Sequence, residues 1–211
     1  MARPRSSTAD QAILAATRAA LVEVGWSGLT MGEVARRAGV AKTTLYRRWT
    51  SKSELVVDAV AVIFDQLALP DRGSLADDIQ EVVASFAALL EQPETQTSLM
   101  AVVSEATRDE RLRERIREAL VERQKRLVVA GRARAQERGE LPVDQDPDTA
   151  RRHADLIFDV IAGAVVHRSL VSAGPVDEEW RTAFTTLLLR GLEELSGSGK
   201  PGPDEGAEQE G

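Results

Sequence analysis

The sequence predicts an all-α protein in which an N-terminal three-helix unit precedes a larger helical region, with about nine helices in total. Two observations favour this fold class. Helix-capping patterns and apolar residues at helical spacing recur in every long stretch of the chain. No run of alternating apolar and polar residues, bounded by turn residues, indicates a β-strand.

Three capping boxes predict where the first helices begin, because the cap hydroxyl and the carboxylate or amide three residues later can satisfy free backbone amides. They are Thr8…Gln11, Thr30…Glu33 and Ser51…Glu54. A short helix is expected between the second and third, after the turn at Gly39. The four expected helices span residues 8–24, 30–38, 41–49 and 51–69.

The remaining helices follow from apolar periodicity between proline and glycine breaks. They are expected near 75–91, 95–106, 109–138, 147–172 and 177–195. The last residues, 196–211, contain five Gly, two Pro and four acids, a composition typical of a disordered tail. The expected units are therefore a basic flexible arm (1–7), a three-helix domain (8–52), a second helical domain joined through the fourth helix (53–195) and an acidic tail (196–211).

Composition limits the class of protein. The 211 residues suffice for a small module and a second domain, and 43% hydrophobic residues can form a core. The chain contains no cysteine, which excludes disulfides, thiolate zinc sites and cysteine nucleophiles. No apolar run reaches membrane-spanning length, and the N-terminus lacks the apolar core of a signal peptide. We therefore expect a cytoplasmic protein with no membrane partner.

Charge is divided unevenly along the chain. The formal net charge is -7, but residues 1–52 contain nine Lys and Arg against three Asp and Glu. The N-terminal segment is thus +6 and the remainder is -13. Such asymmetry is typical of a protein that approaches nucleic-acid phosphates with one end, although a basic solvated face would show the same pattern.

Residues 30–49 have the pattern of a helix-turn-helix. Two helices that cross steeply need a small residue at the crossing and a turn residue that tolerates positive φ, and Ala35 and Gly39 satisfy these needs. The residues expected to fill the angle between the helices are Val34, Ala38, Val40 and Leu45. An ordinary pair of packed helices would look the same, so the surface of the short helix has to discriminate between the two.

The short helix presents a polar face suited to a DNA groove. At 100° per residue, Leu45 and Trp49 define its buried side, and Thr43 and Arg47 point most directly outward. A guanidinium can read guanine, and a threonine can contact thymine. The other polar residues of this helix lie beside them: Lys42, Thr44, Tyr46 and Arg48. A solvated amphipathic helix is the alternative, but the preceding turn and the local charge favour DNA reading.

These motifs make residues 8–55 similar to the N-terminal domain of TetR-family regulators. The matching segments are Gly25-Trp26, Leu29-Thr30, the run 34–40, the run 42–49 and the run 51–55. The resemblance implies phosphate contacts from Tyr46, Lys52 and the helix start at Thr30. It implies that bases or flanking phosphates are faced by Lys42, Thr43, Thr44, Arg47 and Arg48. Ala41, where many relatives have a capping Ser, and Thr43, where many have Gly, depart from the pattern.

Residues 70–195 resemble one type of TetR C-terminal domain. The landmarks are residues 70–75, 105–109, 138–141 and 159–168. The resemblance implies a homodimer formed by the last two long helices, an inducer cavity in each subunit and a fourth helix that moves when ligand binds. Candidate cavity residues are Phe64, Phe86, Met100, Val103, Phe158 and His167. Core packing is the alternative for each of them.

No metal, cofactor or catalytic constellation is expected. His153 and His167 are fourteen residues apart, which matches no compact ligand spacing, so ion pairing with arginines is the favoured role for the polar residues of helix 147–172. The chain has no Gly-x-Ser-x-Gly, dinucleotide or Walker motif.

The combined prediction is a DNA-binding transcriptional regulator of the bacterial cytoplasm and nucleoid. It is expected to be a ligand-responsive repressor that binds a palindromic double-stranded operator as a homodimer and is released by a small-molecule effector. The alternative is a helical adaptor that binds protein partners but no DNA. Steep salt dependence of duplex binding would distinguish the first from the second.

Overall fold

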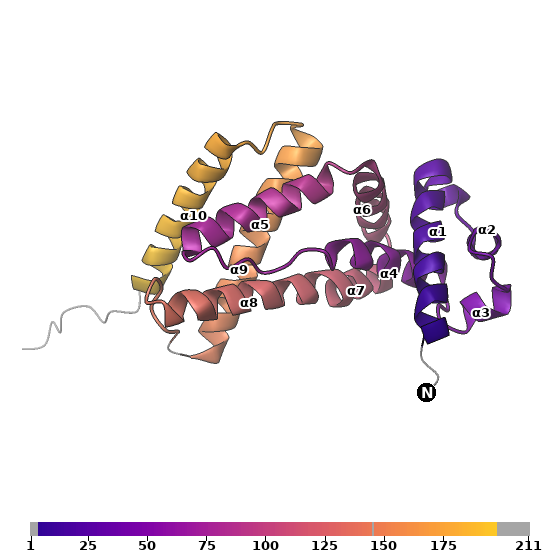
Figure 1. The fold of residues 1–211 in the computed structure, drawn as a ribbon, viewed down its shortest axis with the longest axis horizontal. Coiled ribbons are helices and arrows are strands. Elements are labelled where there is room, and N and C mark those ends of the chain that lie inside the picture. Colours follow the sequence, from indigo (N-terminus) through magenta and orange to yellow (C-terminus); the bar gives the residue numbers. More distant parts are fainter. Residues whose placement is uncertain (1–3, 145, 198–211) are drawn as a thin grey trace, which may run out of the picture.

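The computed structural model describes residues 4–144 and 146–197, and every regular element in these ranges is helical (Figure 1). The all-α prediction is confirmed. The three N-terminal helices lie at one end of an elongated molecule: α1 (Pro4–Gly28), α2 (Met31–Arg37) and α3 (Lys42–Tyr46). Helix α4 (Lys52–Phe64) connects this unit to the second domain.

The second domain contains the remaining helices. They are α5 (Leu75–Leu90), α6 (Pro93–Ala106), α7 (Glu110–Ile116), α8 (Glu122–Glu137), α9 (Pro147–Val166) and α10 (Glu178–Gly197). A π-helical turn, η1 (Arg117–Val121), joins α7 to α8 without a break, and a second one, η2 (His167–Val171), extends α9. The expected single helix over 109–138 is therefore present as α7, η1 and α8 together. Counted in this way, the described residues form nine helices, as predicted.

The helix-turn-helix has the expected core and turn. Gly39 adopts a φ of +66° between α2 and α3, a conformation that glycine reaches without the steric cost of a Cβ. Val34 and Leu45 are fully buried in the angle, and Trp49 is almost completely buried behind them. The turn and the apolar residues on either side of it therefore fix how α3 projects from the molecule.

Two of the three predicted helix caps are present. The Thr30 hydroxyl accepts a hydrogen bond from the Glu33 amide at 3.2 Å, and the Ser51 hydroxyl accepts one from the Glu54 amide at 3.1 Å. The carboxylates do not complete the boxes: Glu33 binds arginines, and Glu54 accepts from the Thr50 amide. The first helix begins at Pro4 instead of Thr8, so this predicted start is wrong.

Helix α4 is shorter than predicted. It ends at Phe64 instead of Leu69, and residues 65–74 form an irregular connector between α4 and α5. Side chains of α8 satisfy backbone carbonyls along this route: Gln124 donates to the Phe64 oxygen at 3.0 Å, and Arg134 donates to the Pro70 oxygen. The connector is thus held against α8 by contacts distant in sequence, which local helical periodicity does not reveal. None of the described helices has the length and hydropathy needed to cross a membrane.

Candidate DNA interface and effector cavity

The outer face of α3 is exposed, as its helical projection predicts. Lys42, Thr43 and Arg47 are exposed, and Tyr46 is 52% exposed, whereas Leu45 on the opposite side is fully buried. Thr44 is half-buried at the margin of this face. Within the part of the chain that the structure describes, no ion pair engages Lys42 or Arg47. Both cations are therefore available to a ligand in front of α3.

Lys42 also lies beside the start of α2. Its Cε and Nζ are 3.0 Å and 3.2 Å from the position that a Cβ would occupy on Gly32. The exposed Thr30 caps the same helix start. A lysine cation and backbone amides thus come together at one edge of the helix-turn-helix, where a phosphate would find both a positive charge and N–H donors.

Two predicted DNA-contacting cations are engaged within the protein. Arg48 forms an ion pair with Asp10 of α1. Lys52 donates a hydrogen bond to the Trp26 carbonyl at 2.8 Å, and its ammonium lies 4.9 Å from the centre of the Trp26 ring. Both side chains therefore tie the helix-turn-helix to α1. Local sequence patterns do not reveal these contacts, because each partner lies on another helix.

The two arginines of α2 are neutralised locally. Hydrogen bonds from Arg36 and Arg37 lower the pKa of Glu33 to about 2. Arg37 also pairs with Glu23 of α1 at 2.7 Å. Arg36 is thus paired within α2 and Arg37 joins α2 to α1, which leaves Lys42 and Arg47 as the exposed cations of the described helix-turn-helix that form no ion pair.

A chain of polar contacts links the end of the helix-turn-helix to the second domain. The Trp49 indole N–H donates to Asp58 of α4 at 2.9 Å, and Arg115 of α7 donates to the other oxygen of Asp58 at 2.7 Å. Arg18 of α1 pairs with Glu94 of α6 at 2.6 Å. The orientation of the helix-turn-helix therefore depends on α4, α6 and α7.

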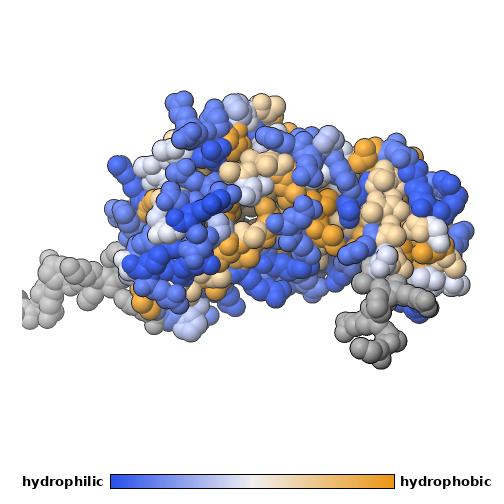
Figure 2. Space-filling model, viewed as in Figure 1, coloured by the Kyte–Doolittle hydropathy of each residue, from blue (hydrophilic) through white to orange (hydrophobic). Residues whose placement is uncertain are grey.

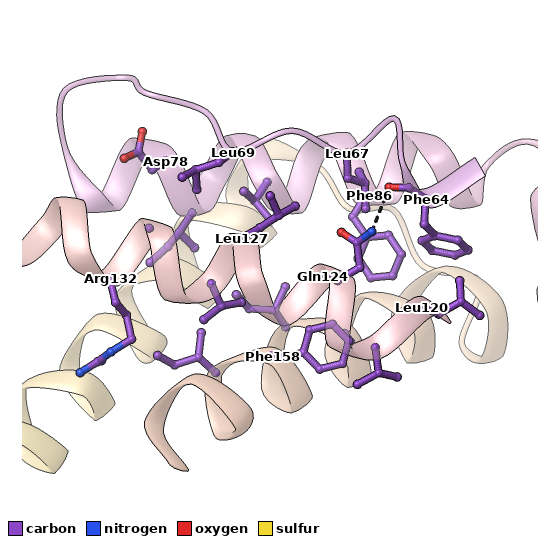
Figure 3. Close-up of a pocket in the computed structure, with 18 of the residues that line it drawn as sticks. Phe64, Leu67, Leu69, Asp78, Phe86, Leu120, Gln124, Leu127, Arg132 and Phe158 are labelled. Atoms are coloured by element: carbon purple, nitrogen blue, oxygen red, sulfur yellow. Dashed lines mark hydrogen bonds between the residues drawn. The ribbon is translucent and has the colours of Figure 1, made fainter. Parts of the chain in front are cut away.

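The second domain encloses a partly open cavity of about 330 Å³ (Figure 3). Four of the six predicted residues line it: Phe64, Phe86, Val103 and Phe158. The rings of Phe64 and Phe86 meet edge to face, with centroids 6.0 Å apart. Met100 is 48% exposed and His167 is also exposed, and neither lines the cavity.

Much of the cavity wall was missed by sequence reasoning. The connector contributes Leu67 and Leu69, and the facing side of α8 contributes Gln124, Leu127, Val128 and Gly131. Leu67 and Leu69 fall within the helix predicted over residues 51–69. On α8, apolar periodicity does not distinguish a cavity wall from packed core. The length of α8 opposite a long connector is the signal that could have indicated them.

Ion pairs engage Asp155 and His153 of α9. Lys125 of α8 pairs with Asp155 at 2.8 Å, and His153 approaches Asp144 at 3.2 Å. Ion pairing with arginines was the expected role. Arg151 pairs with Asp148 within α9 at 3.7 Å, but the partners of Asp155 and His153 are on α8 and in the loop before α9. In the described ranges, no three His, Asp or Glu side chains converge as a metal site would require.

The fold and these two sites define a helix-turn-helix DNA-binding regulator with a separate cavity-bearing domain. Residues 13–59 match the family model described as bacterial regulatory proteins, tetR family, and residues 69–188 match the tetracyclin repressor-like C-terminal domain. The chain belongs to the TetR family of transcriptional regulators, which are not enzymes. The resemblance in both domains is confirmed.

Relatives and solved structures agree with this assignment. The chain is 31% identical over 179 residues to the DNA-binding transcriptional repressor TetR of Mycobacteroides abscessus, covering 82% of this chain and 88% of that protein. It is 26% identical to the uncharacterized HTH-type transcriptional regulator YdeS of Bacillus subtilis, over 92% and 94% of the two chains. The crystal structure of the TetR family transcription regulator SCO0332 matches with a TM-score of 0.69 and 30% identity, over 87% and 98%.

Proposed function

We propose that this regulator is a repressor that binds a palindromic operator as a homodimer and leaves it when a small molecule occupies the cavity. The observation that carries the proposal is the position of α4. Phe64 at its C-terminal end lines the cavity, and Asp58 within it holds Trp49 at the end of the helix-turn-helix. One helix thus borders both sites.

In the proposed complex, Thr43 and Arg47 read base edges in the major groove. Both are exposed on the face opposite the buried Leu45. Lys42, Thr44, Tyr46 and the α2 start at Thr30 contact bases at the margin or the flanking phosphates. Lys52 donates one of its three N–H groups to Trp26 and keeps the other two for phosphate. Arg48 lies at the edge of the DNA-facing surface, where it is held by its ion pair with Asp10.

The proposed dimer face lies on α9 and α10. Leu156 and Val160 are exposed on α9, and Leu187 is 71% exposed on α10. Gly163 and Gly191 continue these faces at helical spacing, and a Cβ at either position would meet nothing within 4 Å beyond its chain neighbours and the nearby backbone of its own helix. Large exposed apolar side chains beside small residues suit close packing of a second copy. Such a dimer would present two α3 helices to half-sites spaced by ~34 Å or a multiple.

Release follows if the ligand-bound cavity requires a different position of α4. A ligand shifts the protein toward the conformation that binds the ligand better, and it does so by no more than its difference in affinity for the two conformations. Movement of α4 would change the spacing of the two α3 helices, so that they no longer match both half-sites. Repression is favoured over activation because a bound dimer can block polymerase without an activating surface, and the M. abscessus relative is named a repressor.

The test is recovery of bound duplexes from a randomised pool by the full-length protein, followed by binding measurements on the recovered sequence. The expected result is a palindromic site bound by a dimer, with affinity that falls steeply as salt increases. A recovered site without two-fold symmetry, or a monomeric protein in light scattering, would contradict the proposal. The recovered operator then serves as the probe for effector release.

A further inference from the structure

The wall of the cavity is almost entirely hydrocarbon. Among the described residues around it, Asp78, Gln124 and Arg132 are the ones with charged or amide side chains. Three phenylalanines, Phe64, Phe86 and Phe158, extend into it from three different helices, as Figure 3 shows. Its volume of about 330 Å³ lies at the lower end of the range of roughly 300–1,000 Å³ found for small-molecule pockets. The space suits a molecule with two or three rings or a chain of similar bulk.

The three polar side chains are bound to the protein. Asp78 is 4% exposed and accepts hydrogen bonds from the Arg72 amide at 2.6 Å and from Arg138 at 3.0 Å. The Gln124 amide donates to the Phe64 carbonyl at 3.0 Å. These groups hold the connector and the end of α4, and their polar atoms contribute almost nothing to the cavity surface.

Arg132 is the cationic residue among the described residues that line the cavity, so it is the candidate partner for an anion. It is 6% exposed, and its Nη2 donates to Asp144 at 2.6 Å. Its Nη1 is buried without a partner in the described structure. Figure 3 shows the guanidinium pointing away from the phenylalanine rings, so that the stem of the side chain borders the cavity. Asp144 already neutralises this guanidinium, and a second anion in the cavity would lie against hydrocarbon.

We propose that the cavity takes an uncharged, predominantly hydrocarbon effector and rejects the same skeleton bearing a carboxylate or sulfonate. The inference rests on the effector function proposed for this cavity and adds the chemical class of the ligand. An apolar molecule gains from every part of its surface that leaves water. An anionic group would lose its hydration, and Arg132 would not replace it, because its guanidinium points away from the phenylalanine rings and is already paired with Asp144. This loss opposes binding of the whole molecule.

Two fluorescent probes that differ by one sulfonate test the proposal: N-phenyl-1-naphthylamine and 8-anilinonaphthalene-1-sulfonate. Each is titrated into the full-length protein at neutral pH, and dissociation constants are taken from the fluorescence increase. The expected result is saturable binding of the uncharged probe at least about tenfold tighter than binding of the sulfonate. Equal or tighter binding of the sulfonate would overturn the proposal. Loss of that binding in Arg132→Met would then assign the cavity to anions.

Neighbouring residues of α8 supply a matched pair of variants that locates the probe. Val128 lines the cavity, whereas Val129 is 53% exposed on the outer side of the helix. Val128→Phe fills part of the cavity and is expected to weaken binding of the uncharged probe at least about tenfold, while Val129→Phe leaves it unchanged. If Val128→Phe does not fold, Ala162→Leu fills part of the cavity from α9 and serves in its place. Equal effects of the inner and outer substitutions would reject this cavity as the site.

The effector function itself is tested separately, by measuring operator affinity with and without the uncharged probe. Tight probe binding without release of DNA supports the hydrocarbon class of ligand and contradicts the regulatory role of the cavity. Failure of the folded protein to bind the uncharged probe contradicts the ligand class and leaves the operator-binding result intact. The two proposals therefore fail on different measurements.

Discussion

At the scale of single residues, the proposed complex assigns two kinds of DNA contact to the outer face of α3. Arg47 is exposed and points directly away from the buried side of α3, which places it where a base edge would lie. Tyr46 is 52% exposed on the flank and reaches a phosphate in the proposed complex. Base contacts discriminate between sequences, whereas phosphate contacts add affinity for any duplex.

Arg47→Ala is expected to weaken operator binding by about 1–3 kcal/mol and to relax the preference at one base pair. Tyr46→Phe, which removes only a hydroxyl, is expected to weaken binding to operator and random duplexes equally. Competition of each variant between the operator, single-base-pair variants of it and random DNA measures the difference. If Arg47→Ala lost affinity equally for all duplexes, its base-reading role would be wrong.

Gly39 is a position where the backbone itself limits the sequence. Its φ of +66° lies in the left-handed region, which costs an alanine roughly 1–2 kcal/mol. Gly39→Ala should lower the free energy of unfolding by about this amount, whereas Gly39→Asn should cost less, because asparagine tolerates this conformation better. Denaturant titration of both variants checks the order. An alanine variant as stable as the wild type would contradict strain at this turn.

Glu33 gives α2 a specific pH dependence. Hydrogen bonds from Arg36 and Arg37 lower its pKa from 4.5 to about 2. Its contribution to stability is therefore complete above about pH 4.5 and is lost as the pH falls toward 2. Glu33→Gln should be less stable than the wild type at pH 7, and the difference should shrink between pH 5 and pH 3. Thermal unfolding over this pH range measures it, and a constant difference would contradict the arginine contacts.

At the scale of elements, α4 connects the cavity to the end of the helix-turn-helix through Asp58. This carboxylate binds Trp49 with one oxygen and Arg115 with the other, so α7 is joined to the helix-turn-helix across α4. The π-helical turn η1 follows α7 directly, and its residues Leu120 and Val121 line the cavity. A change at the cavity wall thus has a short route through α7 to the end of the helix-turn-helix.

Arg115→Met should loosen this link and reduce operator affinity roughly three- to tenfold, the effect expected from losing the net contribution of about one ordinary hydrogen bond. Arg113→Met is the matched control, because Arg113 lies on the same helix and contacts Glu110 and the Ala106 carbonyl instead of Asp58. Operator binding of both variants is compared after circular dichroism has shown that they are folded. Equal affinity of Arg115→Met and wild type would show that the link does not position Trp49.

Local patterns predicted elements well where the determinants are local. The Thr30 and Ser51 caps, the Gly39 turn and the buried Val34 and Leu45 all follow from residues within one or two turns of each other. The predicted end of the fourth helix is wrong because residues distant in sequence determine it. Helix α4 ends at Phe64, and side chains of α8 hold the connector beyond it.

In the candidate sites too, features set by local sequence were predictable, and features set by residues on other helices were not. The exposed face of α3 was predictable from helical projection, but the engagement of Arg48 by Asp10 and of Lys52 by Trp26 was not. Phe64, Phe86, Val103 and Phe158 line the cavity, while Met100 and His167 lie outside it. Helical spacing identifies apolar faces, and the relative rotation of packed helices then decides which face borders a cavity.

At the scale of the whole molecule, the helix-turn-helix, the cavity and the proposed dimer face lie in different places. The helix-turn-helix occupies one end, and α10 lies near the other with the cavity-bearing domain between them (Figure 1). Figure 2 shows hydrophobic residues gathered in the middle of this domain, around a hollow in an otherwise largely hydrophilic face. DNA binding, effector binding and dimer formation would therefore use different parts of the chain and communicate through helices.

The dimer proposal makes a prediction that couples oligomeric state to DNA binding. Leu187 is 71% exposed on α10, so Leu187→Glu should leave the folded subunit intact while placing a charge in the proposed apolar interface. The variant is expected to be monomeric in sedimentation equilibrium at concentrations where the wild type is a dimer. Because two linked α3 helices bind a palindrome far more tightly than one, its operator affinity should fall by at least about a hundredfold.

Val143→Glu is the control for this prediction, since Val143 is 76% exposed in the loop before α9 and belongs to neither α9 nor α10. It should remain a dimer and bind the operator like the wild type. A dimeric Leu187→Glu would place the interface elsewhere, and a monomer with undiminished operator affinity would contradict the need for two subunits. Measuring both properties on both variants therefore separates the position of the interface from its role in DNA binding.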